Sequence, residues 1–191
     1  MNLEEFITTS FRDVRSSNRT DNLHEALVSL LIEQRPELSG LSIKYEYKYP
    51  DCYGGTFQVD IAFFNEDGSC QLIVLAKALN SSVGKNIKNY GNCTIGEAAR
   101  IMHSDSPPAE VMFITVAPRL APIFLSSGDV KGFDDVTKKV SETNPQRVLS
   151  IQYDGTVKSH YIFYDIVDVK QKLNKSDFEE IGFENLHIPC L

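Results

Sequence analysis

Two consecutive apolar segments, residues 57–64 and 70–79, each carry one charge and most strongly constrain the fold of this chain. They flank the sequence Asn-Glu-Asp-Gly-Ser, which is typical of a tight turn, so they predict an antiparallel β-hairpin. Asp60 lies in the middle of the first strand and Lys77 near the end of the second. Because burying an unpaired charge is costly, charges in such strands are usually paired or functional.

The hairpin register decides whether these two charges can meet. If the turn covers residues 66–69, Asp60 lies opposite Leu75. Strand alternation then places Asp60 and Lys77 on one face, with about 7–8 Å between diagonal backbone positions. The other face would be apolar core, made of Val59, Ile61, Phe63, Leu72, Val74 and Ala76. A shift of one residue would remove this alignment.

Hydrophobic periodicity in the rest of the chain predicts alternating helices and strands. We expect helices over residues 1–15, 21–35, 94–102 and 133–140 and from 176, and further strands over 41–49, 111–118, 147–153 and 156–167. Thr94 with Glu97, and Ser176 with Glu179, have capping-box spacing, and Asp154-Gly155 is typical of a hairpin turn. The sequence therefore predicts one α/β domain over residues 1–191, with a mixed central β-sheet flanked by helices.

An aspartate on one strand, followed after a turn by an acidic residue, any residue and a lysine on the next, is the pattern of the PD-(D/E)xK nucleases. The segments GGTFQVDIAFF, with Asp60, and LIVLAKAL, with Lys77, resemble it, and the element order over about residues 20–116 is similar to that nuclease core. The resemblance implies a restriction endonuclease-like fold and Mg²⁺-dependent hydrolysis of phosphodiester bonds in DNA. It also implies that Asp60 holds Mg²⁺ and that Lys77 orients the attacking water or neutralises charge on the phosphate.

Leu75 departs from this pattern, because the family has a metal-ligating Glu or Asp at that position. Mg²⁺ prefers oxygen ligands, and leucine offers none. Three explanations stay open: another carboxylate, from Glu25 or Glu46, completes the catalytic metal site; the chain is a naturally inactive relative; or the position was substituted to trap a complex. The alternative function is therefore a non-catalytic DNA-binding or interaction module on a nuclease scaffold. In a reading of another class, Asp60 and Lys77 form a structural ion pair in an unrelated α/β domain.

The segment that follows Lys77 is locally basic, in a chain whose net charge is −7. Its amides, aromatic ring and cations suit contacts with phosphates and base edges, although a solvated polar loop would have a similar composition. The predicted DNA-binding residues are Lys85, Asn86, Lys88, Asn89, Tyr90 and Arg100. Double-stranded DNA is the expected partner, and a homodimer is expected because palindromic sites are usually read by two copies.

The chain also carries signals about its location. No apolar run approaches the roughly 20 residues that span a bilayer, and the acidic, amphipathic start does not resemble a secretory signal. The four cysteines do not form closely spaced pairs. We therefore expect a cytoplasmic protein with no membrane partner.

Overall fold

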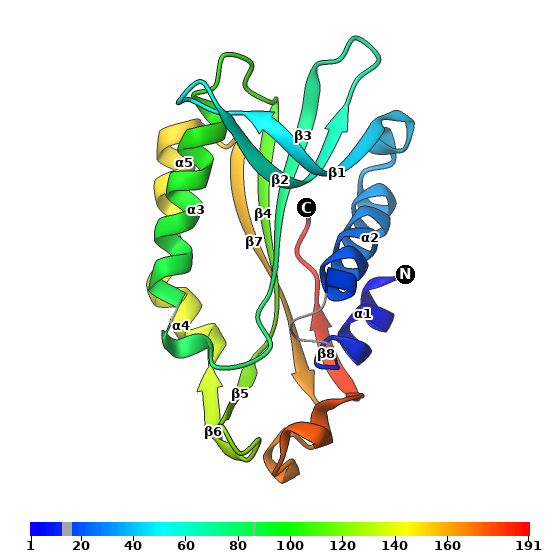
Figure 1. The fold of residues 1–191 in the computed structure, drawn as a ribbon, viewed down its shortest axis with the longest axis vertical. Coiled ribbons are helices and arrows are strands. Elements are labelled where there is room, and N and C mark those ends of the chain that lie inside the picture. The colour runs from blue at the N-terminus through cyan, green and yellow to red at the C-terminus, as the bar shows by residue number, and fades with distance from the viewer. Residues whose placement is uncertain (13–16, 86) are drawn as a thin grey trace.

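The computed structural model describes residues 1–12, 17–85 and 87–191 (Figure 1). The chain begins with two helices and then alternates strands and helices. The elements are α1 (Leu3–Thr9), α2 (Ser17–Gln34), β1 (Ser42–Pro50), β2 (Thr56–Phe64), β3 (Cys70–Ala78), α3 (Ile87–Met102), β4 (Glu110–Pro118), β5 (Leu120–Phe124), β6 (Val130–Asp135), α4 (Val136–Thr143), α5 (Gln146–Tyr153), β7 (Val157–Ile166) and β8 (Phe183–His187). Short 3-10 helices cover Pro36–Gly40, Val83–Lys85, Val169–Gln171 and Lys175–Phe178.

The central sheet of the described chain has six strands in the order β1-β2-β3-β4-β7-β8. Strands β1, β2 and β3 are antiparallel neighbours, β3, β4 and β7 are parallel, and β8 is antiparallel to β7. Strands β5 and β6 form a separate two-stranded sheet. The predicted fold class, α/β with a mixed central sheet flanked by helices, is confirmed. The parallel strands β3 and β4 are joined through α3, as a parallel pair requires a crossover connection.

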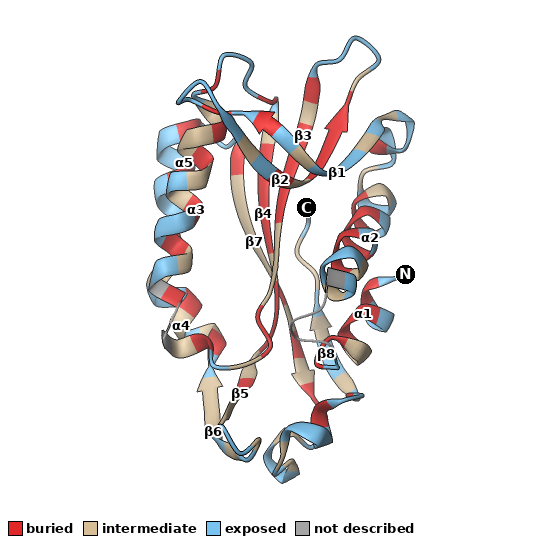
Figure 2. Cartoon of the chain, viewed as in Figure 1, coloured by how far each residue is buried: buried red, intermediate tan, exposed pale blue. Residues whose placement is uncertain are grey.

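Each face of the sheet is covered by its own helices, and the buried residues follow the strands between them (Figure 2). Helices α1 and α2 pack on one face, where Leu27 and Leu31 contact a core that includes Ile61 and Leu72. Helices α3 and α5 pack on the other, where Ala98 and Ile101 face Ile73, Leu75 and Phe113. Within the described residues, no helix combines the length and the apolar character that crossing a bilayer would need.

The first hairpin has the predicted register over its central pairs. Ile61 pairs with Val74, Ala62 with Ile73 and Phe63 with Leu72, and a bulge follows at Phe64 before the turn. Ile61, Phe63, Leu72 and Val74 all belong to the core beside α2, and Ala76 packs against it, as predicted. Val59 does not, because it lies in the core beside α3. The predicted apolar face is therefore correct except at Val59.

The change of face at Val59 has a counterpart in the neighbouring strand β1. Glu46 has a left-handed backbone, with φ 49°, and no ladder pair joins it to Asp60, although Tyr45–Ile61 and Tyr47–Val59 pair on either side. Tyr45 stacks on His24 of α2, whereas the next aromatic residue, Tyr47, packs with Phe64 in the core beside α3. At the level of Glu46 and Asp60, the apolar side chains of both strands therefore change from the α2 side of the sheet to the α3 side. Regular alternation along a strand does not predict this change.

The secondary structure of the C-terminal half differs from the prediction in several places. Residues 147–153 form most of helix α5 and not a strand, because Leu149 and Tyr153, one helical turn apart, are its buried residues. Asp154 and Gly155, with φ 49° and 79°, end this helix, since the left-handed conformation that suits a hairpin turn also suits a helix C-terminus. Segment 133–140 is divided between β6 and α4, because Asp135 caps the helix by accepting from the Lys138 N–H.

Several other helix boundaries also differ from the prediction. Helix α3 begins at Ile87 and not at Thr94, whose hydroxyl donates to the Tyr90 carbonyl inside the helix. Helix α1 ends at Thr9, and residues 13–15 of the predicted first helix lie outside the described residues. The predicted final helix is only the short 3-10 helix Lys175–Phe178, capped by Asn174, and strand β8 follows it.

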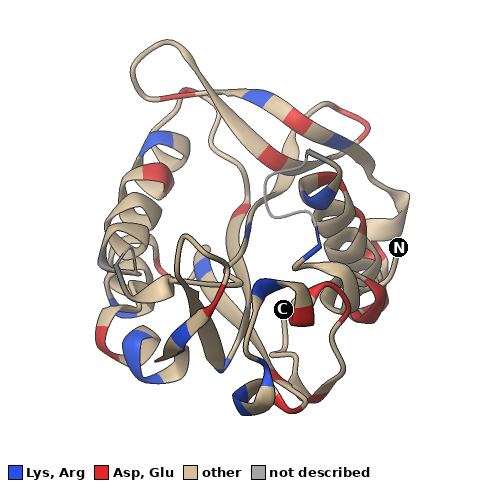
Figure 3. Ribbon diagram, turned by 60° about the horizontal axis from the view of Figure 1, so that its bottom comes forward, with Lys and Arg blue, Asp and Glu red and all other residues tan. Residues whose placement is uncertain are grey.

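Charge is distributed unevenly between the two layers of helices (Figure 3). Helices α1 and α2 carry mainly acidic residues: Glu4, Glu5, Asp21, Glu25 and Glu33, against Arg19. Helices α3, α4 and α5 carry mainly basic residues: Lys88, Arg100, Lys138, Lys139 and Arg147, against Glu97 and Glu142. By sequence, a polyanion is therefore attracted to the layer of α3, α4 and α5, and a cation to the layer of α1 and α2.

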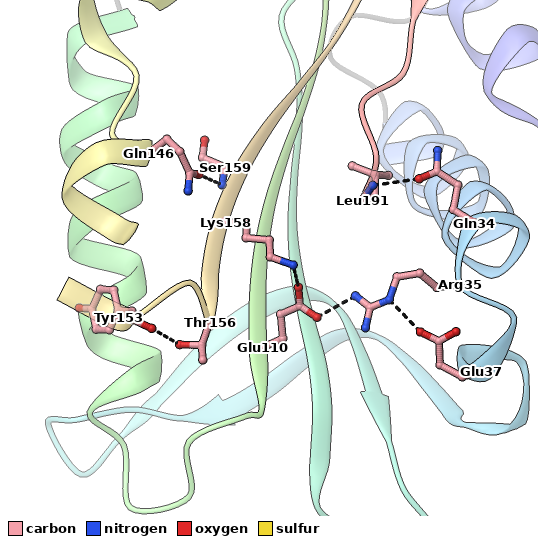
Figure 4. A network of polar contacts seen from close by, with 10 residues as sticks. All are labelled: Gln34, Arg35, Glu37, Glu110, Gln146, Tyr153, Thr156, Lys158, Ser159 and Leu191. Carbon is pink, nitrogen blue, oxygen red and sulfur yellow. Dashed lines mark hydrogen bonds and ion pairs between the residues drawn. The ribbon is translucent and has the colours of Figure 1, made fainter. Parts of the chain in front are cut away.

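One polar network joins the end of α2 to the central strands (Figure 4). Arg35 donates to one carboxylate oxygen of Glu110 at 2.7 Å, and Lys158 donates to the other at 2.8 Å. Nearby, the Leu191 N–H donates to the Gln34 side chain at 2.9 Å, which attaches the C-terminus to the same helix. The network fixes the position of α2, the helix that carries His24, relative to the sheet.

We expect the substitution Glu110→Gln to lower the free energy of unfolding by about 2 kcal/mol, the range for hydrogen bonds to charged groups. Burial acts to raise the pKa of Glu110, but the hydrogen bonds from Lys158 and Arg35 outweigh it and lower this pKa. The difference between the two proteins should therefore be complete at pH 7 and shrink as the pH falls below about 4.3, through the folded-state pKa. Urea unfolding at several pH values measures it.

Glu37→Gln is the matched control, since exposed Glu37 accepts from the same Arg35 at 3.0 Å. Exposed pairs contribute little, so its effect should be much smaller than that of Glu110→Gln. Equal losses from both substitutions would contradict the role given to Glu110.

Candidate functional site

Asp60 lies where strands β2 and β3 separate. The ladder between them reaches Ile61 and Val74, and beyond it the Asp60 Oδ2 accepts the Ala76 N–H at 2.6 Å. The carboxylate thus occupies the gap between the strands, with 26% of its side chain exposed. Burial raises the pKa of Asp60, and the hydrogen bond from Ala76 and the charges of His24 and Lys77 act against this. The Ala76 N–H thus holds one oxygen of the Asp60 carboxylate, and the other oxygen, Oδ1, takes no part in that contact.

His24 and Glu46 meet Asp60 at this place. The His24 Nε2 lies 3.9 Å from the Asp60 Oδ1, and its Nδ1 lies 3.6 Å from the Glu46 Oε1. The other Glu46 oxygen accepts from the Gln58 side-chain amide. One ligand atom from each of the three residues lies within 4.8 Å of the others, which is a geometry that can hold a metal ion. The predicted metal ligands Asp60 and Glu46 are therefore brought together.

His24 was not predicted, although its position contains a signal. It follows Leu23 and precedes Leu27 and Leu31, so it falls on the buried side of α2, and only 2% of its side chain is exposed. A polar residue on the apolar face of a helix requires a partner or a function. The sequence does not show which strand residues lie opposite this helix position, so the signal could not identify Asp60 and Glu46 as its neighbours.

Glu25, the other predicted metal and catalytic carboxylate, lies beside the group of His24, Glu46 and Asp60 but is not part of it. Its side chain is 59% exposed, and it pairs with the N-terminal amine at 3.4 Å. Together with Asp21, His24 and Tyr45 it lines an open hollow of about 280 Å³. The acidic wall of this hollow offers a favourable entry for a cation to His24.

Lys77 lies on the α3 side of the gap. Its Nζ is 3.8 Å from the Glu97 Oε2 and 5.6 Å from the centre of the Tyr90 ring, and both partners belong to α3. The prediction placed Asp60 and Lys77 on one face, whereas the Asp60 carboxylate lies in the gap itself and faces α2. The two charges still interact, since that of Lys77 acts to lower the pKa of Asp60.

Glu97 is the second functional candidate that the sequence reading missed. Burial raises the pKa of Glu97, the charge of Lys77 lowers it and that of Asp60 raises it again. Its Oε2 is buried and has no hydrogen-bond partner among the described residues. The available signal was that Glu97 is the single acidic residue in a basic segment, but its capping-box spacing suggested a purely local role. The structure instead brings its charge within range of Lys77 and Asp60.

Leu75, at the position of the missing acid, is part of the hydrophobic core. Only 6% of it is exposed, and it packs with Ala98 of α3 and Phe113 of β4. It lines the same small cavity as Lys77 and Tyr90, so a side chain at this position lies on the α3 side of the sheet. A carboxylate there would be near Lys77 and surrounded by apolar groups.

The predicted DNA-binding residues divide into three groups. The side chains of Lys85 and Lys88, and Asn86 as a whole, lie outside the described residues. Asn89 is exposed on α3, and half-buried Tyr90 lies beneath Lys77.

Arg100 is engaged in the fold. It donates to buried Asp51 and lies over the rings of Tyr53 and Phe57, at 5.5 and 4.7 Å. Asp51 also accepts the backbone N–H groups of Tyr53 and Gly55, so these contacts hold the loop between β1 and β2 against α3. A guanidinium used in this way supports the loop, and a contact of Arg100 with phosphate stays a prediction.

Comparisons with protein-family models, with curated proteins and with solved structures find no match for this chain. The site itself consists of a carboxylate in the gap between two strands, a histidine and a glutamate on its α2 side, and a lysine–glutamate pair on its α3 side.

Proposed function

We propose that this chain is a metal-dependent DNA endonuclease of the restriction type, which hydrolyses phosphodiester bonds. The observation that carries the proposal is the position of Asp60 in the gap between β2 and β3, with the charge of Lys77 acting on it from the α3 side. A carboxylate with a free oxygen and an ammonium group are the pair that such hydrolysis needs, one to hold a divalent cation and the other to stabilise phosphate charge. The sheet order β1-β2-β3-β4 is in keeping with the nuclease core that the sequence resembles.

Each side chain has a defined role in this proposal. Asp60 and Glu46 hold the cation, expected from the resemblance to be Mg²⁺, which lowers the pKa of bound water and neutralises phosphate charge. Lys77 donates to the attacking water or to a phosphate oxygen. Glu97 keeps Lys77 in place on the α3 side through their 3.8 Å ion pair and supplies the carboxylate that Leu75 lacks there.

The substrate follows from the charge distribution. Double-stranded DNA approaches the basic layer of α3, α4 and α5, toward Lys77, because the acidic layer of α1 and α2 repels phosphates. A homodimer would present two such sites to a palindromic sequence. The four free cysteines are in keeping with a protein that acts in the cytoplasm, where thiols stay reduced.

The test compares cleavage of mixed-sequence duplex DNA, in Mg²⁺ or Mn²⁺, by the wild type and by Lys77→Met. We expect metal-dependent fragments from the wild type and a rate about 10²–10⁴-fold lower for the variant, the usual loss when one positioned charged group is removed. Lys131→Met is the matched control, because Lys131 is an exposed strand lysine on β6 and should leave the rate unchanged.

Two outcomes would contradict the proposal. Equal cleavage by Lys77→Met and wild type would remove Lys77 from the reaction. Binding of duplex DNA without cleavage in either metal would favour the alternative, a non-catalytic DNA-binding module, for which the buried apolar Leu75 is the supporting observation.

A further inference from the structure

The group of His24, Glu46 and Asp60 contains a nitrogen ligand, which the expected Mg²⁺ site does not need. The ligand atoms lie within 4.8 Å of one another, and His24 comes from α2, Glu46 from β1 and Asp60 from β2. The three residues belong to separate elements, so only the tertiary structure brings them together.

The His24 imidazole is the observation that distinguishes this group from an ordinary acidic cluster. Its side chain is 2% exposed, and its Nε2 is buried without a hydrogen-bond partner among the described residues. That nitrogen is directed toward the Asp60 Oδ1 at 3.9 Å, which is too long for a hydrogen bond. A buried polar atom left without a partner is costly, so its presence here points to a ligand that the protein alone does not supply.

The spacing of the atoms fits one shared ion. With bonds of about 2.1 Å, two ligands on one ion are about 3 Å apart when adjacent and about 4.2 Å apart when opposite. An ion binds one imidazole nitrogen: the His24 Nε2 lies 3.9 Å from the Asp60 Oδ1, which falls between these values, and one ligand atom of each of the three residues lies within 4.8 Å of the others. Glu46 is the adjustable member, since 41% of its side chain is exposed.

Both carboxylates are oriented by contacts outside the group. The second oxygen of Asp60 accepts the Ala76 N–H, and the second oxygen of Glu46 accepts from Gln58. Each therefore directs its remaining oxygen toward His24. Contacts of this kind hold the first ligands of metal sites in place.

We infer that His24, Glu46 and Asp60 form a mixed nitrogen–oxygen site for a first-row transition-metal dication, and that this site prefers such an ion to Mg²⁺. Imidazole is a good ligand for these metals, whereas Mg²⁺ favours oxygen ligands alone. Three protein ligands leave coordination positions open to water or to a substrate oxygen. The inference rests on the proposed function in placing the ion at Asp60, but ion binding is measured without DNA.

The test uses Mn²⁺ and Mg²⁺ with the whole chain, followed by loss of the free Mn²⁺ electron paramagnetic resonance signal and by thermal unfolding. We expect one Mn²⁺ per chain, bound at least about tenfold more tightly than Mg²⁺. At about 100 times its Kd, Mn²⁺ should raise Tm by about 5–10 °C. His24→Phe, which keeps a ring, and Glu46→Gln, at an exposed position, should each weaken Mn²⁺ binding at least about tenfold.

Glu25→Gln is the control, because it removes the same charge from the wall of the hollow beside His24 but from outside the group. Its Mn²⁺ affinity should stay within about twofold of the wild type, because Glu25 is an exposed charge already paired with the N-terminal amine. No Mn²⁺ binding by the wild type, equal binding of Mg²⁺, or equal losses from Glu46→Gln and Glu25→Gln would each overturn the inference. Should His24→Phe not fold, Glu46→Gln still decides it.

Failure of this inference and failure of the proposed function give different results. Selective Mn²⁺ binding that depends on His24, with no DNA cleavage in either metal, would support the metal site and contradict the proposed nuclease activity. If His24→Phe cleaved DNA in Mg²⁺ at the wild-type rate, the nuclease activity would be supported and the role of His24 in the metal site would be contradicted.

Discussion

Asp60→Asn should abolish Mn²⁺ binding and reduce DNA cleavage by at least about 10³-fold, within the range for loss of a main catalytic group. The amide oxygen of asparagine can still accept the Ala76 N–H, so the gap between β2 and β3 should keep its shape. The negative charge that attracts the cation is lost. Cleavage rates and Mn²⁺ titrations of the two proteins measure both effects.

The same substitution should not destabilise the metal-free protein. Burial raises the pKa of Asp60, so its charged form is disfavoured where it stands, and a neutral amide removes that cost. We expect the metal-free Tm to stay the same or rise, while the Mn²⁺-induced rise in Tm disappears. Asp165→Asn, on strand β7 beside Arg119, is the control and should keep both activity and Mn²⁺ response. A large fall in the metal-free Tm of Asp60→Asn would identify Asp60 as part of a structural ion pair.

Leu75→Glu should destabilise the fold by about 3 kcal/mol or more, equivalent to a fall in Tm of about 6–12 °C. The new carboxyl group would be buried among Ala98, Phe113 and other apolar side chains of the core beside α3. The neighbouring Lys77 is already paired with Glu97, so it offers limited compensation. Thermal unfolding measures the loss, and we expect no gain in cleavage.

Leu75→Met controls for the change of shape at this position, because swaps of similar volume in a core usually cost less than about 1.5 kcal/mol. If Leu75→Glu instead matched the wild type in stability and cut DNA faster in Mg²⁺, position 75 would be a true ligand position. Glu97 would then not replace its carboxylate.

Much of the first hairpin could be predicted from the sequence, because the apolar alternation and the turn both act over short distances. The pairs Ile61–Val74 and Phe63–Leu72 follow from them directly. The error at Val59 arises because Glu46 adopts a left-handed backbone on the neighbouring strand, and nothing in the residues around it demands that conformation. Local pattern thus located Asp60 and Lys77, and tertiary structure decided where their side chains point.

The partners of these two residues could not be found in the same way. His24 and Glu97 are 36 and 37 residues distant from Asp60 in the sequence, on helices before and after the hairpin, and only packing brings them near it. Helix α5 was misread for a related reason: its apolar residues fit both periods over eight positions, and contacts with the sheet favoured the helix.

The left-handed backbone of Glu46 also bears on how two copies of this chain can associate. Strand β1 is an outer strand of the central sheet, and such strands are templates for recruiting another chain. At Glu46 the regular run of main-chain donors and acceptors is interrupted, which divides a nine-residue strand into two short lengths. A continuous sheet that joins two protomers through β1 is therefore disfavoured.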